Sequence, residues 1–251
     1  DFAVDQVAVR LAGPFAVTFD KRPDEAPRIA SRKARRLLML LAVHRGELVA
    51  IHRIVDVLWA DQPPRDPEQN VATLVSRLRS ALGPYVIVGG RHGYRLGSAP
   101  HVWVDLVEAG QLIAEAKRRL AAGEPAVAAV AAARGLEMLA AGPLLADEPD
   151  ADWVLAARAD AQRLMRDGRH AAAGAALLTA DPQAAIKVST AAIVADRFDE
   201  AAHRQLMRAY WNAGEPAKAL VVYERLRRNL AAELGVDPSP ETRAVHLAVL
   251  R

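Results

Sequence analysis

The stretch that decides the fold reads Asp66-Pro-Glu-Gln-Asn-Val-Ala-Thr-Leu-Val-Ser-Arg-Leu-Arg-Ser-Ala-Leu-Gly83. Aspartate followed by proline is a typical helix start, because the carboxylate caps the first turn and proline fits the first helical position. Gly83-Pro84 ends the helix. The apolar residues between recur at helical spacing: Val71, Leu74, Val75, Leu78 and Leu82. The stretch predicts an amphipathic helix over 67–82, about 24 Å long at about 1.5 Å per residue.

The opposite face of this helix carries short polar side chains and arginine. Asn70, Thr73, Ser76 and Arg77 project from it, with Arg79 toward the edge. Such residues suit a helix that enters the major groove of DNA, where arginine reads guanine and asparagine reads adenine. An ordinary amphipathic surface helix has the same pattern, and the helix alone favours that alternative.

The segments on both sides favour DNA binding. Upstream, Val7–Phe19 reads as two short strands broken by a glycine and a proline, Ser31 caps a following helix, and Ile51–Trp59 reads as a shorter one. Downstream, Tyr85–Gly97 reads as a hairpin with a glycine-rich turn. Strands, three helices and a terminal hairpin are the order of a winged helix-turn-helix. The hairpin tip, with Arg91 and His92, would reach a minor groove or phosphates.

The charges are unevenly distributed. The 251 residues hold 33 Lys or Arg, 30 Asp or Glu and seven His, a net charge of +3. Residues 1–100 contain 15 of the basic and 10 of the acidic residues, so the front of the chain is basic. From Gln69 to Val104 there is no acid at all. Acid-free basic tracts favour a polyanion, because phosphate binding releases counterions; a solvated helix face is the alternative.

Several function classes are excluded or disfavoured. The absence of cysteine excludes disulfides, cysteine-bound metal centres and thiol catalysis. The histidines have no metal-ligand spacing, and Gly89-Gly90 lacks the lysine and helix of a nucleotide loop. We therefore expect no enzyme, no cofactor and no metal site. The apolar tracts are too short for a membrane span and no secretory signal is visible, which favours a cytoplasmic protein.

The remainder of the chain reads as helical. His101–Asp105 is interpreted as a joint between two domains, 1–100 and 101–251. The pattern from Leu206 to Tyr223 resembles one tetratricopeptide helix pair, without a second good copy at the usual period. The predicted helices are Leu106–Leu120, Pro125–Ala140, Asp152–Asp167, Pro182–Ala195, Asp199–Ala213 and Pro216–Leu234, separated by glycines that include Gly168. The expected fold class is mainly α with a small β component: a winged helix followed by an all-α, tetratricopeptide-like domain.

Two sets of motifs carry a family resemblance. Ser31-Arg-Lys-Ala-Arg-Arg-Leu-Leu38, Ile54-Val-Asp-Val-Leu-Trp59, the 70–83 stretch and Gly93-Tyr-Arg-Leu96 resemble the DNA-binding domain of OmpR/PhoB-type response regulators. Gly142-Pro-Leu-Leu-Ala-Asp147, Asp199 to Tyr210, Tyr223 to Leu230 and Glu233 to Thr242 resemble the bacterial transcriptional activator domain. Together they are similar to the AfsR/SARP group of actinobacterial activators.

The resemblance implies a cytoplasmic activator that binds direct repeats in double-stranded DNA at promoters, as a dimer. It also implies recruitment of RNA polymerase, through its σ factor and neighbouring subunits. Two positions depart from the family pattern. The wing position that commonly holds a basic residue is Gly90, with Arg91 one place later, and Ala50 replaces a hydroxyl cap. Both departures affect the expected list of DNA contacts.

The predicted DNA-binding residues fall into two groups. Those expected to reach base edges are Asn70, Thr73, Ser76 and Arg77, and those expected at phosphates or on the wing are Ser31, Arg32, Arg36, Arg79, Arg91 and His92. The rival hypothesis is an interaction scaffold, in which the helical half binds protein partners or an effector and the winged helix serves protein contacts.

Overall fold

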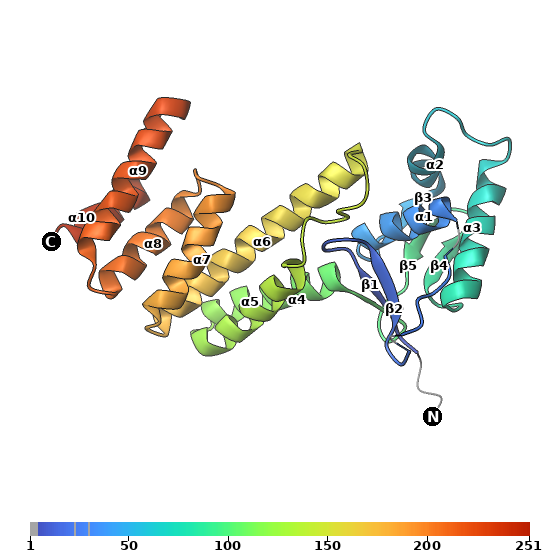
Figure 1. Cartoon of the computed structure of the whole chain (residues 1–251), viewed down its shortest axis with the longest axis horizontal. Coiled ribbons are helices and arrows are strands. Elements are labelled where there is room, and N and C mark those ends of the chain that lie inside the picture. Colours follow the sequence, from blue (N-terminus) through green and yellow to red (C-terminus); the bar gives the residue numbers. More distant parts are fainter. Residues whose placement is uncertain (1–4, 23, 30) are drawn as a thin grey trace. The chain divides into compact units, whose positions relative to one another are not determined.

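The computed structural model describes residues 5–22, 24–29 and 31–251 (Figure 1). The chain forms two compact units. The first joins the described residues up to Ala109 with Met138–Ala161, and the second joins Gly110–Glu137 with Gln162–Arg251. The fold class is the expected one: a winged helix with small sheets, followed by a helical domain.

The first unit contains two small sheets. In one, β1 (Val7–Arg10) pairs antiparallel with β2 (Ala16–Phe19) and parallel with β6 (Val102–Val104). In the other, β5 (Gly93–Leu96) lies between β3 (Val49–Ala50) and β4 (Ile87–Gly90), so that β4 is an edge strand. The predicted hairpin and the predicted pair of upstream strands are confirmed.

Three helices pack together with the second sheet. They are α1 (Arg32–Val43), α2 (Ile51–Trp59) and α3 (Pro67–Leu82), and α1 packs against α2, α3 and β5. Because α1 is covered on several sides, Leu37–Ala42 is buried without interruption. Ala50 precedes α2 and gives it no side-chain cap, as expected.

The segment His101–Asp105, interpreted from the sequence as a joint, contains a strand and lies within the first compact unit. Val102–Val104 forms β6 beside β1, and Asp105 is only 3% exposed. Its carboxylate accepts hydrogen bonds from the backbone N–H groups of Leu11, Ala12 and Leu106, at 2.7–3.0 Å. Burial raises the pKa of Asp105, and these three donors oppose that rise. The segment is therefore an integral part of the first unit.

A loop from the second half of the sequence also belongs to the first unit. Gly142–Asp147 lies along the β1–β2 connection, where the backbone N–H of Gly13 donates to Pro143 O (3.0 Å) and that of Leu145 donates to Leu11 O (2.8 Å). The guanidinium of Arg158 donates to the carbonyl oxygens of Leu144, Leu145 and Glu148. Residues 112 positions apart, Arg36 and Glu148, form an ion pair.

The second unit is helical. Its elements are most of α4 (Asp105–Ala121) and α5 (Pro125–Leu139), the later part of α6 (Asp152–Leu178), α7 (Pro182–Ala195), α8 (Glu200–Asn212), α9 (Pro216–Leu234) and α10 (Pro240–Val249). Alanines from α4, α5 and α6 form one buried cluster. α7, α8, α9 and α10 pack in neighbouring pairs, and the α8–α9 pair contains the predicted tetratricopeptide-like pattern.

Two predictions fail here for identifiable reasons. Gly168 does not end a helix, since α6 continues to Leu178. A Cβ at this position would lie 2.9 Å from side-chain atoms of Ile113 and Leu136. The glycine serves close packing. α10 was not predicted, although Ser239-Pro240 is a helix start, and the Ser239 Oγ accepts from the Thr242 N–H at 3.3 Å. Within the described residues, no helix combines the length and apolarity needed to cross a bilayer.

Candidate nucleic-acid interface

Burial of one face of α3 orients the opposite, polar face toward solvent. Asp66 caps the helix, accepting from the Gln69 N–H at 3.0 Å, and Pro67 occupies the first position. The five apolar residues predicted to form the stripe are all buried. Asn70, Thr73, Ser76 and Arg77 are all exposed, so the structure brings the four predicted base-reading residues onto one helix face.

Two of these four side chains are fixed by their own helix. The Asn70 Nδ2 donates to Asp66 O at 2.7 Å, and the Thr73 Oγ1 donates to Gln69 O at 2.9 Å. Asn70 is exposed as a residue, and its Oδ1 is the acceptor of the same amide group. Arg77 has no hydrogen bond or ion pair within the described part of the chain. Its guanidinium is the group on this face with the most donors to offer a ligand.

Arg79 connects α3 to the hairpin. Its Nε donates to Ile87 O at 3.0 Å and its Nη2 lies 3.4 Å from Gly89 O. In an antiparallel pair, carbonyls alternate between the partner strand and the free side. Val86 O accepts from Gly97 N toward β5, so Ile87 O and Gly89 O face the free edge. The side chain of Arg79 therefore lies along the open edge of the wing, at β4. Figure 1 shows β4 beside α3.

The wing tip is a two-residue turn. Gly90 pairs with Gly93, and Arg91 and His92 lie exposed between them. Gly93 is required by close packing, because a Cβ there would lie 2.4 Å from Val49 O. Arg95, which was not among the predicted site residues, is also exposed on β5. Side chains of a strand alternate between its two faces, so the position of Arg95 next to the apolar Tyr94 could have predicted that Arg95 is exposed.

The start of α1 holds the remaining predicted contacts. Ser31 caps this helix, its Oγ accepting from the Ala34 N–H at 3.2 Å, and Arg32 is exposed beside it. Arg36 is half-buried, and its Nη2 lies 3.1 Å from the Glu148 carboxylate. Arg32 is therefore the cation of this group that is exposed and not paired with Glu148. A phosphate at Arg36 would have to compete with Glu148.

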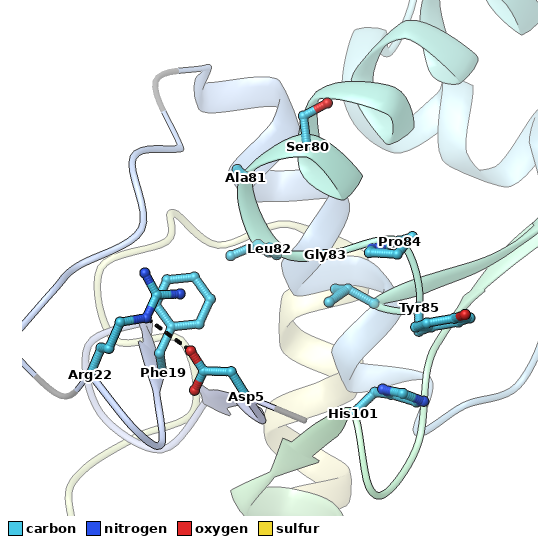
Figure 2. A pocket seen from close by; sticks show the side chains of 11 residues that line it. Asp5, Phe19, Arg22, Ser80, Ala81, Leu82, Gly83, Pro84, Tyr85 and His101 are labelled. Atoms are coloured by element: carbon cyan, nitrogen blue, oxygen red, sulfur yellow. Dashed lines mark hydrogen bonds and ion pairs between the residues drawn. The ribbon is translucent and has the colours of Figure 1, made fainter. Parts of the chain in front are cut away.

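A separate hollow of about 340 Å³ lies at the C-terminal end of α3. Figure 2 shows the Asp5–Arg22 ion pair and Phe19 on one side, and Tyr85 stacked on His101 on the other. None of the predicted DNA-binding residues lines it. Among the described residues there is also no group of three or more His, Asp or Glu side chains placed to hold a metal ion.

Two family models match the chain in succession. Residues 26–96 match the model described as transcriptional regulatory protein, C terminal, and residues 104–250 match the bacterial transcriptional activator domain.

Several regulators are similar over nearly the whole chain. The regulatory protein AfsR of Streptomyces coelicolor is 30% identical, covering 92% of this chain and 23% of AfsR. The transcriptional regulatory protein EmbR of Mycobacterium tuberculosis is 30% identical over 96% of this chain and 62% of EmbR. The regulatory protein DnrI of Streptomyces peucetius is 27% identical, covering 88% of this chain and 85% of DnrI. The chain thus spans less than two thirds of AfsR and EmbR.

A solved structure of EmbR from Mycobacterium tuberculosis, in complex with a low-affinity phosphopeptide, has the same fold. Its TM-score is 0.87 at 26% identity, over 98% of this chain and 65% of that one. The winged helix and the helical domain therefore occur together, in this order, in regulators of transcription.

Proposed function

The chain belongs to the AfsR/SARP family of bacterial transcriptional regulators, and on this premise we propose that it is a sequence-specific DNA-binding activator. The observation that carries the proposal is the exposed polar face of α3. It lies next to the wing, within a tract of the sequence that contains no acidic residue. A helix with arginine, asparagine and hydroxyl groups on a basic face fits the major groove in shape, charge and hydrogen-bonding capacity.

The proposed contacts follow the exposure of each side chain. Arg77 and Asn70, with Thr73 and Ser76, read base edges. Phosphate contacts come from the remaining predicted group: Ser31, Arg32, Arg36, Arg79, Arg91 and His92. Within that group Arg32, Arg91 and His92 are the exposed members, whereas Arg36 and Arg79 also bind protein oxygens.

The other assignments rest on the family. We propose a winged-helix domain over 1–100 and an activator domain over 101–251, supported by family matches that end at residue 96 and resume at residue 104. We further propose a cytoplasmic protein that binds a direct repeat as a dimer and recruits RNA polymerase through its σ factor and neighbouring subunits. DNase footprinting on repeats with one half-site removed tests the dimer. Transcription in vitro with purified polymerase tests recruitment.

The central experiment is a titration of the chain against labelled promoter fragments at two salt concentrations. We expect affinity to fall with salt and to exceed the affinity for bulk DNA. Replacing Arg77 by alanine should weaken specific binding by ~1–3 kcal/mol, the scale of one base-reading pair. Arg134→Ala is the matched control, since Arg134 is an exposed arginine on α5. An unchanged footprint for Arg77→Ala would refute the role of Arg77.

The rival function is an interaction scaffold. In that case the same titration would show no preference for any promoter fragment over bulk DNA. Binding would also be insensitive to Arg77→Ala, because the polar face of α3 would serve protein contacts.

A further inference from the structure

A groove of about 300 Å³ lies among α7, α8 and α9 of the second unit. Leu206 and Tyr210 of α8 are part of its lining, with Val194 of α7 on one side and Val221 of α9 on the other. Val194 is 83% exposed and Val221 is 61% exposed. Single exposed valines are ordinary on a protein surface, but two that line one groove form an apolar site open to solvent.

The charged residues of the groove all have one sign. Lys218 and Arg225 of α9 line it, and no Asp or Glu is among its described lining residues. Lys218 and Arg225 are seven positions apart on one helix, which places them about 10 Å apart along the axis at about 1.5 Å per residue. Val221 lies between them on the same face, because residues three and four apart are neighbours on a helix.

These two cations are available to a ligand. Arg225 is exposed and has no ion pair or hydrogen bond within the described part of the chain. Lys218 pairs with Glu215 and lies over the Tyr210 ring, 5.6 Å from its centroid. The Lys218–Glu215 pair is on the surface, where an ion pair contributes little, so an incoming carboxylate can replace Glu215 at little cost.

We propose that this groove docks an acidic amphipathic helix of a partner protein. Two carboxylates seven residues apart on the incoming helix would meet Lys218 and Arg225, and its apolar side chains would cover Val194 and Val221. The volume is at the lower limit of small-molecule sites, which fits anchoring side chains better than a cofactor. The proposal does not depend on DNA binding.

The test uses fluorescein-labelled synthetic helices and fluorescence anisotropy with the whole 251-residue chain. One peptide has leucines at helical spacing flanked by glutamates, and the second has lysine in place of every glutamate. The variants are Val221→Asp and Arg225→Glu. Val130→Asp and Arg134→Glu are matched controls on α5, because Val130 is 62% exposed and Arg134 follows it by the same four positions.

We expect saturable binding of the acidic peptide and not of the lysine peptide. Val221→Asp should weaken it by roughly ten- to a hundredfold, the scale of burying one valine. Arg225→Glu should weaken it by about tenfold and the loss should shrink with salt. The proposal is overturned if the acidic peptide does not bind, if the lysine peptide binds equally well, or if the groove variants match the α5 controls. Circular dichroism of each variant verifies folding; both groove substitutions are at exposed positions, and Arg225→Glu still provides the test if Val221→Asp does not fold.

Discussion

Arg79 provides the sharpest test of how the wing is held. The sequence pattern predicts that this arginine contacts phosphate, whereas the structure shows it donating to Ile87 O at 3.0 Å and lying 3.4 Å from Gly89 O. The informative substitution is Arg79→Met, which removes the guanidinium and keeps most of the apolar stem. It leaves two carbonyls on the edge of β4 without their donor.

The magnitude follows from these distances. A hydrogen bond from a charged donor contributes about 1.5–3 kcal/mol, and the 3.4 Å contact is near the limit of a hydrogen bond. We therefore assign the full energy of a charged hydrogen bond only to the bond with Ile87 O. Because Arg79 is half-buried, we take the lower part of the range. We therefore expect Arg79→Met to lower the free energy of unfolding by about 1.5–2 kcal/mol.

The assay is urea unfolding, combined with a salt titration of DNA binding. Arg95→Met is the control, because Arg95 is exposed on the same hairpin and should leave stability unchanged. A residue that only contacts phosphate would leave the unfolding free energy unchanged and reduce the salt slope by about one. That combination for Arg79→Met would refute the positional role that the hydrogen bonds indicate.

Three further predictions concern Asp105, Gly93 and His203. Asp105→Ala leaves three buried N–H groups without an acceptor and should cost at least about 3 kcal/mol in urea unfolding, at about 1–3 kcal/mol for each; a loss below about 1 kcal/mol would contradict this. Gly93→Ala should weaken DNA binding by displacing β5 from Val49, whereas Gly90→Ala, whose Cβ meets nothing within 4 Å, should not; equal effects in a gel shift would count against it. Burial lowers the pKa of His203 from its usual 6.5, so the unfolded chain binds this proton more tightly, and stability present above pH 6.5 is lost as the pH falls below it. His203→Gln should reduce that loss in thermal unfolding between about pH 7.5 and about pH 5.5, and an unchanged pH dependence would exclude His203 as its source.

Local signals predicted the helices of the winged domain well. The Asp66-Pro67 start and the five-residue apolar stripe are sufficient to locate α3, because capping and burial both act within a few turns. The Ser31 cap and the turn at Arg91 and His92 are equally local. The exposed face of the candidate interface follows directly from these elements.

Long-range pairing was not visible in the sequence. β6 is only three residues long and exists because it pairs with β1, about ninety residues earlier in the chain. Arg36 has the sequence context of a phosphate ligand, yet its ion-pair partner is Glu148, 112 positions away. Gly168 reads as a helix end by composition, but Ile113 and Leu136 determine its role. Each of these cases depends on a partner that no local pattern identifies.

The loop at Gly142–Asp147 has a practical consequence for domain exchange between relatives. Its backbone is hydrogen-bonded to Leu11 and Gly13, and the buried Leu144 and Leu145 fill the same unit. A chimera that transplants only the N-terminal hundred residues would bring a foreign loop against this hairpin. The portable module is discontinuous and includes Met138–Ala161. We therefore expect chimeras to be more stable where both segments come from the same parent.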